Sequence, residues 1–317
     1  MTGPRVLRLF SAVLLLAVLT FVPSAAAEAT TFTVNSTLDT TDASPGDGVC
    51  ADTGGLCTLR AAIMEANALS GPDRIDVPPG DHVLTIAPGS GDGPTGGDLD
   101  ITSDIELYGA GAHLTFIGPE LVGVATHRVF DIGGTASTVR IEGVTIRNGS
   151  DASGGGVRTA ASNVFTIIRS HIVENWATSR GAGIHILGSS TFNIIESTIS
   201  ENLDLSSAGS GGAIFIEGTV DGSIINTTVS ANRGVSGVGI SVIGTPLVSV
   251  VNSTIGFNIA RPGGTLVSQV LVSGSGDVVL LNTIVAAPSG VACDASGPVV
   301  SGGFNLVTDG TCNPVVS

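Results

Sequence analysis

Apolar and polar residues alternate with a period of two through much of this chain. Residues 165–167 and 192–194 each place an apolar residue on both sides of a polar one, the pattern of a half-buried β-strand. After a short break the alternation resumes at 170–172 and 197–199. No helical period appears in this region, so the pattern predicts short strands separated by turns.

One stretch, residues 58–69, has helical spacing instead. Its apolar residues recur three or four positions apart: Leu59, Ile63, Ala66 and Leu69. Thr58 is a suitable N-cap, and Gly71-Pro72 stops the helix. The open end of a stacked β-structure exposes strand edges and core, so a capping helix is expected there.

Two motifs recur through the middle of the chain. The first is Gly-rich and ends on an apolar anchor: Val157, Ile184, Ile214, Ile240 and Leu266. The second reads small-x-apolar-x-x-Asn and ends at Asn175, Asn202, Asn232 and Asn258. A shorter version, residues 144–148, precedes it.

The spacing of these motifs predicts a solenoid. Four segments have the same length of 18 residues from anchor to Asn: Val157 to Asn175, Ile184 to Asn202, Ile214 to Asn232 and Ile240 to Asn258. The connection from each Asn to the next anchor varies between 8 and 12 residues. Stacked strands cannot change length without losing register, whereas a loop on one face can.

The predicted fold is therefore all-β: a single-stranded, right-handed parallel β-helix with two or three strands per coil and a short N-terminal capping helix. The Leu-x-x-Leu-x-Leu pattern of leucine-rich repeats is missing, and propeller blades need about 40 residues. We predict an N-terminal cap over 28–75, the β-helix over 76–290, and a disulfide-closed C-terminal cap over 291–317.

The Asn row has a structural and a functional interpretation. Asn tolerates left-handed turns, and its amide can hydrogen-bond to the next coil and form a ladder. We favour this structural Asn ladder over a ligand-binding stripe.

The first 27 residues resemble a cleaved signal peptide. Arg5 and Arg8 precede an apolar run over 9–22, and Ala25-Ala26-Ala27 is a small-residue cleavage site. The run is shorter than the roughly 20 residues of a membrane span. We therefore expect a secreted, extracellular protein with no membrane span after cleavage, and hold an uncleaved anchor as the alternative.

Four cysteines fit an exported protein. Three pairings are open, and the local one, Cys50–Cys57 with Cys293–Cys312, is favoured because each pair lies at one end of the mature chain. A metal or redox site is the alternative, but no C-x-x-C spacing occurs.

The amino-acid composition limits the classes of partner that the protein can bind. The 317 residues include 45 Gly, only 12% charged residues and a net charge of −15, and all 12 basic residues are Arg. Nucleic acid is bound through dense Lys/Arg contacts, so it is excluded as a partner. We expect a monomer that binds a polysaccharide or a surface protein.

The N-terminal region resembles a known group. Residues 47–50, 57–63 and 65–68, followed by the turn at 75–80, look like the CSLREA domain of secreted bacterial β-helix proteins. Thr58 and Ala61 depart from its name-giving motif. The repeats resemble those of polymorphic outer-membrane proteins, which are adhesive, and the wider resemblance is to the pectin-lyase-like superfamily. CSLREA proteins share no activity that would transfer.

Lyases of that superfamily use Arg or Lys as base with Asp-bound calcium on a sheet face. Lys is absent here, and the Asn-Thr-Asp, Asp-Asp, Gly-His-Asp and Arg-Ile-Lys motifs of the related hydrolases are missing. The sequence shows no compact Asp cluster with a basic partner. The net charge of −15 also repels a polyuronate unless calcium bridges the two.

Several residues are candidate sites. Glu174 and Glu201 share a repeat offset and should stack about 5 Å apart, the separation of a retaining glycosidase pair; exposed turn carboxylates are the favoured alternative. Weak calcium candidates lie in a Gly/Pro loop without EF-hand spacing: Asp39, Asp42 and Asp47. Asp98 and Asp100 are a similar case.

The remaining polar candidates are assigned to the surface. His171 and His185 have no nucleophile at a useful spacing, and Arg169 should pair with Glu196 across coils. We therefore predict a secreted or cell-surface, non-catalytic, adhesin-like protein that binds carbohydrate or another surface. The alternative is a divergent polysaccharide lyase or glycoside hydrolase. No cofactor should be required, with calcium left open.

Overall fold

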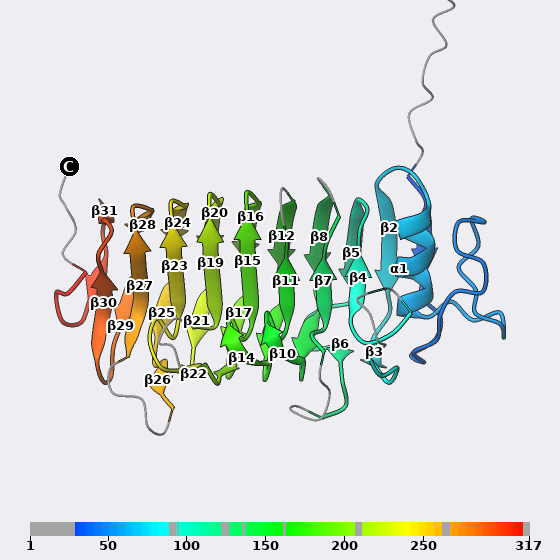
Figure 1. The fold of residues 1–317 in the computed structure, drawn as a ribbon, viewed down its shortest axis with the longest axis horizontal. Helices are drawn as coiled ribbons and strands as arrows, with labels where there is room; N and C mark the ends of the chain where they lie inside the picture. The colour runs from blue at the N-terminus through cyan, green and yellow to red at the C-terminus, as the bar shows by residue number, and fades with distance from the viewer. Residues whose placement is uncertain are drawn as a thin grey trace, which may run out of the picture.

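The chain forms a parallel β-solenoid, as predicted (Figure 1). The computed structural model describes residues 29–88, 93, 95–121, 127–134, 137–160, 163–206, 211–261 and 267–312. The proposed signal peptide, 1–27, lies outside these residues. Within them, no helix is long and apolar enough to cross a membrane.

Sheets A and B form two long faces of the solenoid. Sheet A has ten strands, in the order β1 (Thr31–Thr33), β2 (Asp73–Val77), β5 (Ile105–Gly109), β8 (Thr138–Glu142), β12 (Val164–Ile168), β16 (Thr191–Ile195), β20 (Asp221–Ile225), β24 (Leu247–Val251), β28 (Asp277–Leu281) and β31 (Val299–Gly303). Sheet B has nine, in the order β3 (Gly80–Val83), β6 (Thr115–Gly118), β9 (Thr145–Arg147), β13 (His171–Val173), β17 (Thr198–Ser200), β21 (Thr228–Ser230), β25 (Thr254–Gly256), β29 (Ile284–Ala286) and β32 (Leu306–Val307).

Two further sheets complete the coils. Sheet C has eight strands, β4 (Leu99–Ile101), β7 (Phe130–Ile132), β11 (Val157–Thr159), β15 (Ile184–Gly188), β19 (Ile214–Gly218), β23 (Ile240–Gly244), β27 (Ser268–Gly274) and β30 (Val291–Ala295). Sheet D has five: β10 (Ser150–Ser153), β14 (Trp176–Arg180), β18 (Leu203–Asp204), β22 (Arg233–Gly234) and β26 (Ile259–Ala260).

A full central coil thus has four strands, one more than the upper limit predicted. The additional strands belong to sheet D, and three of them are only two residues long, too short to show a period in sequence. Repeat residues stack in direct parallel register, as in Phe165 against Phe192. Inward side chains of every coil join one continuous apolar core that runs from Phe32 to Cys312.

The predicted Asn ladder is present and fully buried. Each Nδ2 donates to the Oδ1 of the next coil: Asn175 to Asn202 at 3.0 Å, Asn202 to Asn232 at 3.0 Å, and Asn232 to Asn258 at 2.8 Å. Each Nδ2 also donates to two backbone carbonyls, as Asn202 does to Ile172 and Ser200. The ladder therefore satisfies backbone groups at a corner where strand pairing is interrupted.

The predicted geometry of the Asn corner was wrong in one respect. The left-handed residue is the one before each Asn, with φ between 56° and 59° at Glu174, Glu201, Ala231 and Phe257. The earlier Asn148 holds this left-handed place itself, with φ 62°. The ladder position of its coil is taken by Gly149, whose N–H donates to Asn175 Oδ1 at 3.0 Å.

The last repeat also differs from its predicted register. Ile240 pairs with Val270, so Val270 is the fifth anchor, and Leu266 lies outside the described residues. The ladder ends on Gln269, whose Oε1 accepts from Asn258 Nδ2 at 2.8 Å. A Gln eleven residues after the Asn carries no repeat signal.

The two ends of the stack are closed differently. Helix α1 (Leu59–Ala68) lies beyond β2 at the N-terminal end (Figure 1), and its predicted cap is confirmed because Thr58 Oγ1 accepts from the N–H of Ala61 at 3.1 Å. Both predicted disulfides, Cys50–Cys57 and Cys293–Cys312, are formed. Because β1 and β2 extend sheet A, the division at residue 75 stays a prediction.

A buried carboxylate lies in sheet D. Asp204 is fully buried and accepts hydrogen bonds from the N–H of Ser206 at 2.8 Å and from its Oγ at 3.1 Å. Burial raises the pKa of Asp204, while Ser206 and the charge of Arg261 act in the opposite direction.

Replacing Asn202 by Ala should destabilise the solenoid by about 3 kcal/mol, because buried backbone groups in two coils lose their partner. Urea unfolding followed by circular dichroism measures this. Ser249→Ala, on the outer face of sheet A, should change stability by less than about 0.5 kcal/mol. Equal effects of the two substitutions would contradict a structural role for the ladder.

Asp204→Asn should stabilise the protein at neutral pH. A raised folded pKa means that the folded state binds more protons than the unfolded one, so stability is lost as the pH rises from the unfolded pKa of about 3.9 through the folded value. The variant lacks this loss, and its advantage should vanish at a pH below both values. Urea midpoints across pH test this, and a variant no more stable than wild type at neutral pH would contradict it.

Candidate functional site

An open groove of about 440 Å³ lies along the corner between sheets B and D. Eight residues from four successive coils line it: Glu174, Trp176, Glu201, Leu203, Ala231, Arg233, Phe257 and Ile259. It contains the only Trp of the chain.

The Asn corner positions all eight residues. Because each Asn is buried, the residues on either side of it project outward and form two columns. The left-handed column is Glu174, Glu201, Ala231 and Phe257. The strand column is Trp176, Leu203, Arg233 and Ile259, which stack in register in sheet D.

The groove has an acidic and an apolar half. Glu174 and Glu201 lie beside Trp176 in the first two coils, and Phe257 and Ile259 lie in the last. Phe257 is 64% exposed and Ile259 is 38% exposed, whereas Trp176 is half-buried. Exposed aromatic and aliphatic side chains at repeated positions point to contact with a ligand or partner.

Glu174 and Glu201 occupy equivalent positions one coil apart and are exposed. In the described part of the chain, no hydrogen bond or ion pair engages either carboxylate. A glycosidase acid is usually kept protonated by burial, and neither residue is buried. The pair therefore has the setting of a binding surface, and its catalytic role stays a prediction.

The two histidines are placed differently. His171 is half-buried, with Nε2 2.8 Å from Ser200 Oγ. Burial lowers its pKa, His113 adds to this, and Glu201 and Glu174 oppose it. The surface assignment of His185 was wrong: it is 4% exposed, with Nε2 3.2 Å from Glu217 Oε1.

The hydrogen bond from His185 and the nearby Arg180 outweigh burial and lower the pKa of Glu217.

The predicted cross-coil pair of Arg169 and Glu196 is present at 3.6 Å, and Arg169 also pairs with Glu142. A second hollow, of about 680 Å³, lies at the corner between sheets A and B, and Arg169, Glu142 and Glu196 line it. Their ion pairs compensate the charges there.

Among the described residues, the calcium candidates Asp39, Asp42 and Asp47 do not converge into one carboxylate cluster, and their calcium role stays a prediction. Asp39 is paired with the buried Arg60 at 2.6 Å and accepts from the N–H groups of Thr85 and Ile86. Asp42 and Asp47 accept backbone N–H bonds within their own loop. These carboxylates hold the N-terminal cap together.

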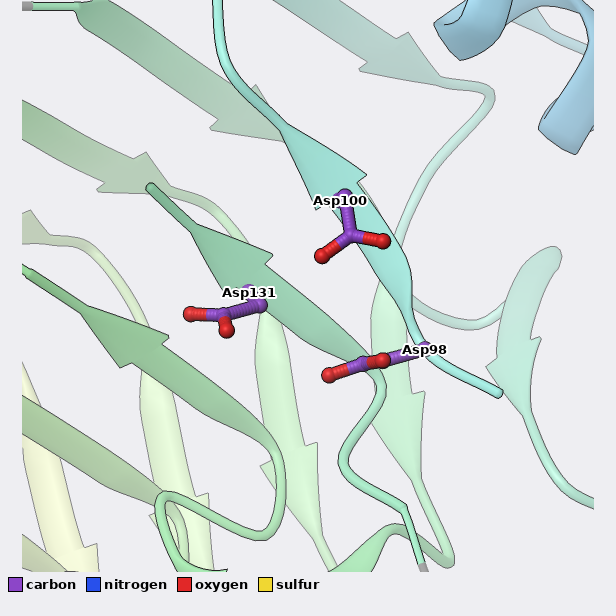
Figure 2. Close-up of side chains that lie close together, drawn as sticks. All are labelled: Asp98, Asp100 and Asp131. Carbon is purple, nitrogen blue, oxygen red and sulfur yellow. The ribbon is translucent and has the colours of Figure 1, made fainter. Parts of the chain in front are cut away.

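Carboxylates converge elsewhere, on the face of sheet C (Figure 2). Asp98, Asp100 and Asp131 present oxygens that lie within 4.8 Å of one another. Asp100 in β4 is the register partner of Asp131 in β7, and Asp98 directly precedes β4. Sequence reasoning considered Asp98 and Asp100 but missed Asp131, although 99–101 and 130–132 share the order apolar, Asp, apolar.

Two arginines enter this cluster. Arg128 Nη1 lies 2.9 Å from both Asp98 Oδ2 and Asp131 Oδ2, and its Nη2 lies 3.1 Å from Asp151. Arg158 binds both oxygens of Asp131. The expectation that no Asp cluster with a basic partner exists was therefore wrong.

The cluster does not fit calcium. Calcium needs about six to eight oxygen ligands, and the Arg128 guanidinium already bridges Asp98 and Asp131, where an ion would have to lie. With Asp98, Asp131 and Arg128 all about 95% buried, the set is an internal ion-pair network that joins the first coils.

Comparisons with known proteins support the fold alone. No protein-family model and no curated protein matches the sequence, so the CSLREA resemblance stays a prediction. The crystal structure of pectate lyase Pel9A is similar with a TM-score of 0.53 and 13% identity, covering 87% of this chain and 69% of that one. The architecture is thus that of a pectate-lyase-like parallel β-helix.

Calcium should leave the thermal stability of the wild-type protein unchanged. In Arg128→Met, the buried Asp98 and Asp131 lose the guanidinium that bridges them, at a cost of about 3–5 kcal/mol, and millimolar CaCl₂ should restore part of the lost stability. Arg74→Met, which removes an exposed pair with Asp76, is the control. A calcium-induced rise in the wild-type melting temperature would show that the cluster holds an ion as it stands.

Proposed function

We propose that this protein is a secreted, non-catalytic β-helix protein that binds an extended polysaccharide in the groove between sheets B and D. The observation that carries the proposal is the presence of Trp176 and Phe257 with exposed polar side chains in one open groove. A sugar ring has an apolar face that packs on aromatic side chains and hydroxyls that donate to carboxylates.

The dimensions of the groove favour a polymer. Its lining repeats once per coil, at about 4.8 Å, so four coils present about 14 Å of continuous surface. A linear glycan has a similar regular repeat, which allows successive sugar units to meet equivalent positions. Binding along a chain, rather than in a closed pocket, also suits attachment to a surface.

An extracellular location is consistent with the structure. Both disulfides are formed, and disulfides persist in oxidising compartments. With a signal peptide expected at 1–27, we propose that the mature protein works outside the cell, where polysaccharides are exposed.

Catalysis by a divergent lyase or hydrolase is the second candidate. Two observations favour it: the architecture resembles that of a pectate lyase, and Glu174 and Glu201 stack one coil apart. Release of reducing ends, or absorbance from unsaturated uronates, across a glycan panel would favour this enzyme over the binding protein.

Because Trp176 is the only Trp, its fluorescence reports on the groove alone. Oligosaccharides that bind should change its intensity and emission maximum in a saturable manner. Phe257→Ala should weaken binding by about tenfold or more, as truncation of an aromatic anchor does. Leu247→Ala removes a 48% exposed side chain on sheet A and should leave affinity unchanged. If no glycan in a broad panel changes the fluorescence, the proposal fails.

A further inference from the structure

We infer that the groove selects glycans that carry protonated amino groups over neutral and acidic ones. This inference rests on the proposed glycan binding and names the class of ligand. It follows from the charged side chains that line the groove and from the indole of Trp176 beside them.

The groove has an uncompensated negative charge at one end. Glu174 and Glu201 contribute −2 and Arg233, in the adjoining coil, +1, so the lining carries −1. No ion pair within 4.0 Å joins Arg233 to either Glu in the described residues. At one coil's rise of about 4.8 Å, the two carboxylates repel each other, and a cation between them relieves that repulsion.

Trp176 adds the second half of the recognition. It lies two residues after Glu174, in the neighbouring column of the groove. An indole face attracts a cation through its quadrupole and packs on the apolar face of a sugar. An amino sugar presents both features in one unit, an ammonium and an apolar ring face.

The ammonium fits this pair better than a metal ion does. An ammonium has three donors, which two carboxylates and a neighbouring hydroxyl or water satisfy. Calcium needs about six to eight oxygens, and the eight lining residues include only two carboxylates. The charge of −15 also draws cations toward the protein and repels polyuronates.

The other large polar hollow differs in this respect. At the corner between sheets A and B, Arg169 lies between Glu142 and Glu196, so those carboxylates are already paired. The groove at Trp176 therefore combines aromatic surface with free negative charge.

The test titrates Trp176 fluorescence with a β-1,4-linked glucosamine oligomer and with its N-acetylated counterpart of equal length. At low salt and a pH at which the amine is protonated, the glucosamine oligomer should bind about tenfold tighter or more. High salt should reduce this preference, because exposed charges are screened, and EDTA should not change it.

The double variant Glu174→Gln, Glu201→Gln should lose the preference, so that its affinities for the two oligomers become equal. Glu196→Gln is the matched control, since Glu196 is also exposed and left-handed, with φ 51°, but lies at the other corner. It should retain the preference.

The outcomes separate the two proposals. Equal affinity for both oligomers, or a preference that survives in the double variant, would overturn the amino-group inference and leave glycan binding intact. A preference lost on adding EDTA would assign the carboxylates to a metal ion and overturn the inference too. The absence of any fluorescence response, to these oligomers and to a wider glycan panel, would overturn the glycan-binding function itself.

Discussion

Four successive coils of this protein are held in register by buried Asn amides that bond from one coil to the next. The corner after sheet B interrupts strand pairing, and there the Asn side chain supplies the donors and acceptors that the backbone lacks. An unsatisfied buried polar group costs about 1–3 kcal/mol. The four-coil ladder therefore fixes both the length of the strands and the direction in which the neighbouring side chains point.

The groove is a consequence of that constraint. Because the Asn must point inward, Glu174 and Trp176 on either side of it must point outward, and the same holds in each coil. The core and the site are thus specified by alternate residues of one short segment. The ion-pair network at Arg128 is separate from the groove and joins the first coils. The groove instead presents exposed carboxylates and aromatic side chains that can contact a ligand.

The fold was predictable because its signal is repeated. The constant 18 residues between Ile184 and Asn202, and between their equivalents, can arise only if the strands stack in register. Gln269 could not be predicted, since it reaches the ladder from the following coil and breaks the repeat. Asp131 joined Asp98 and Asp100 through pairing of two irregular coils, and the groove itself depends on the left-handed corner, which was assigned to the wrong residue.

The left-handed corner holds three residue types at its four positions, Glu, Glu, Ala and Phe, on one backbone geometry. The fold therefore tolerates acidic, small and aromatic side chains at the position before the Asn. The buried Asn itself packs into the core. The residues that line such a groove can be substituted one coil at a time. Duplication of a coil would lengthen the groove by the rise of one coil. Recognition in such a protein can diverge quickly while the scaffold stays the same.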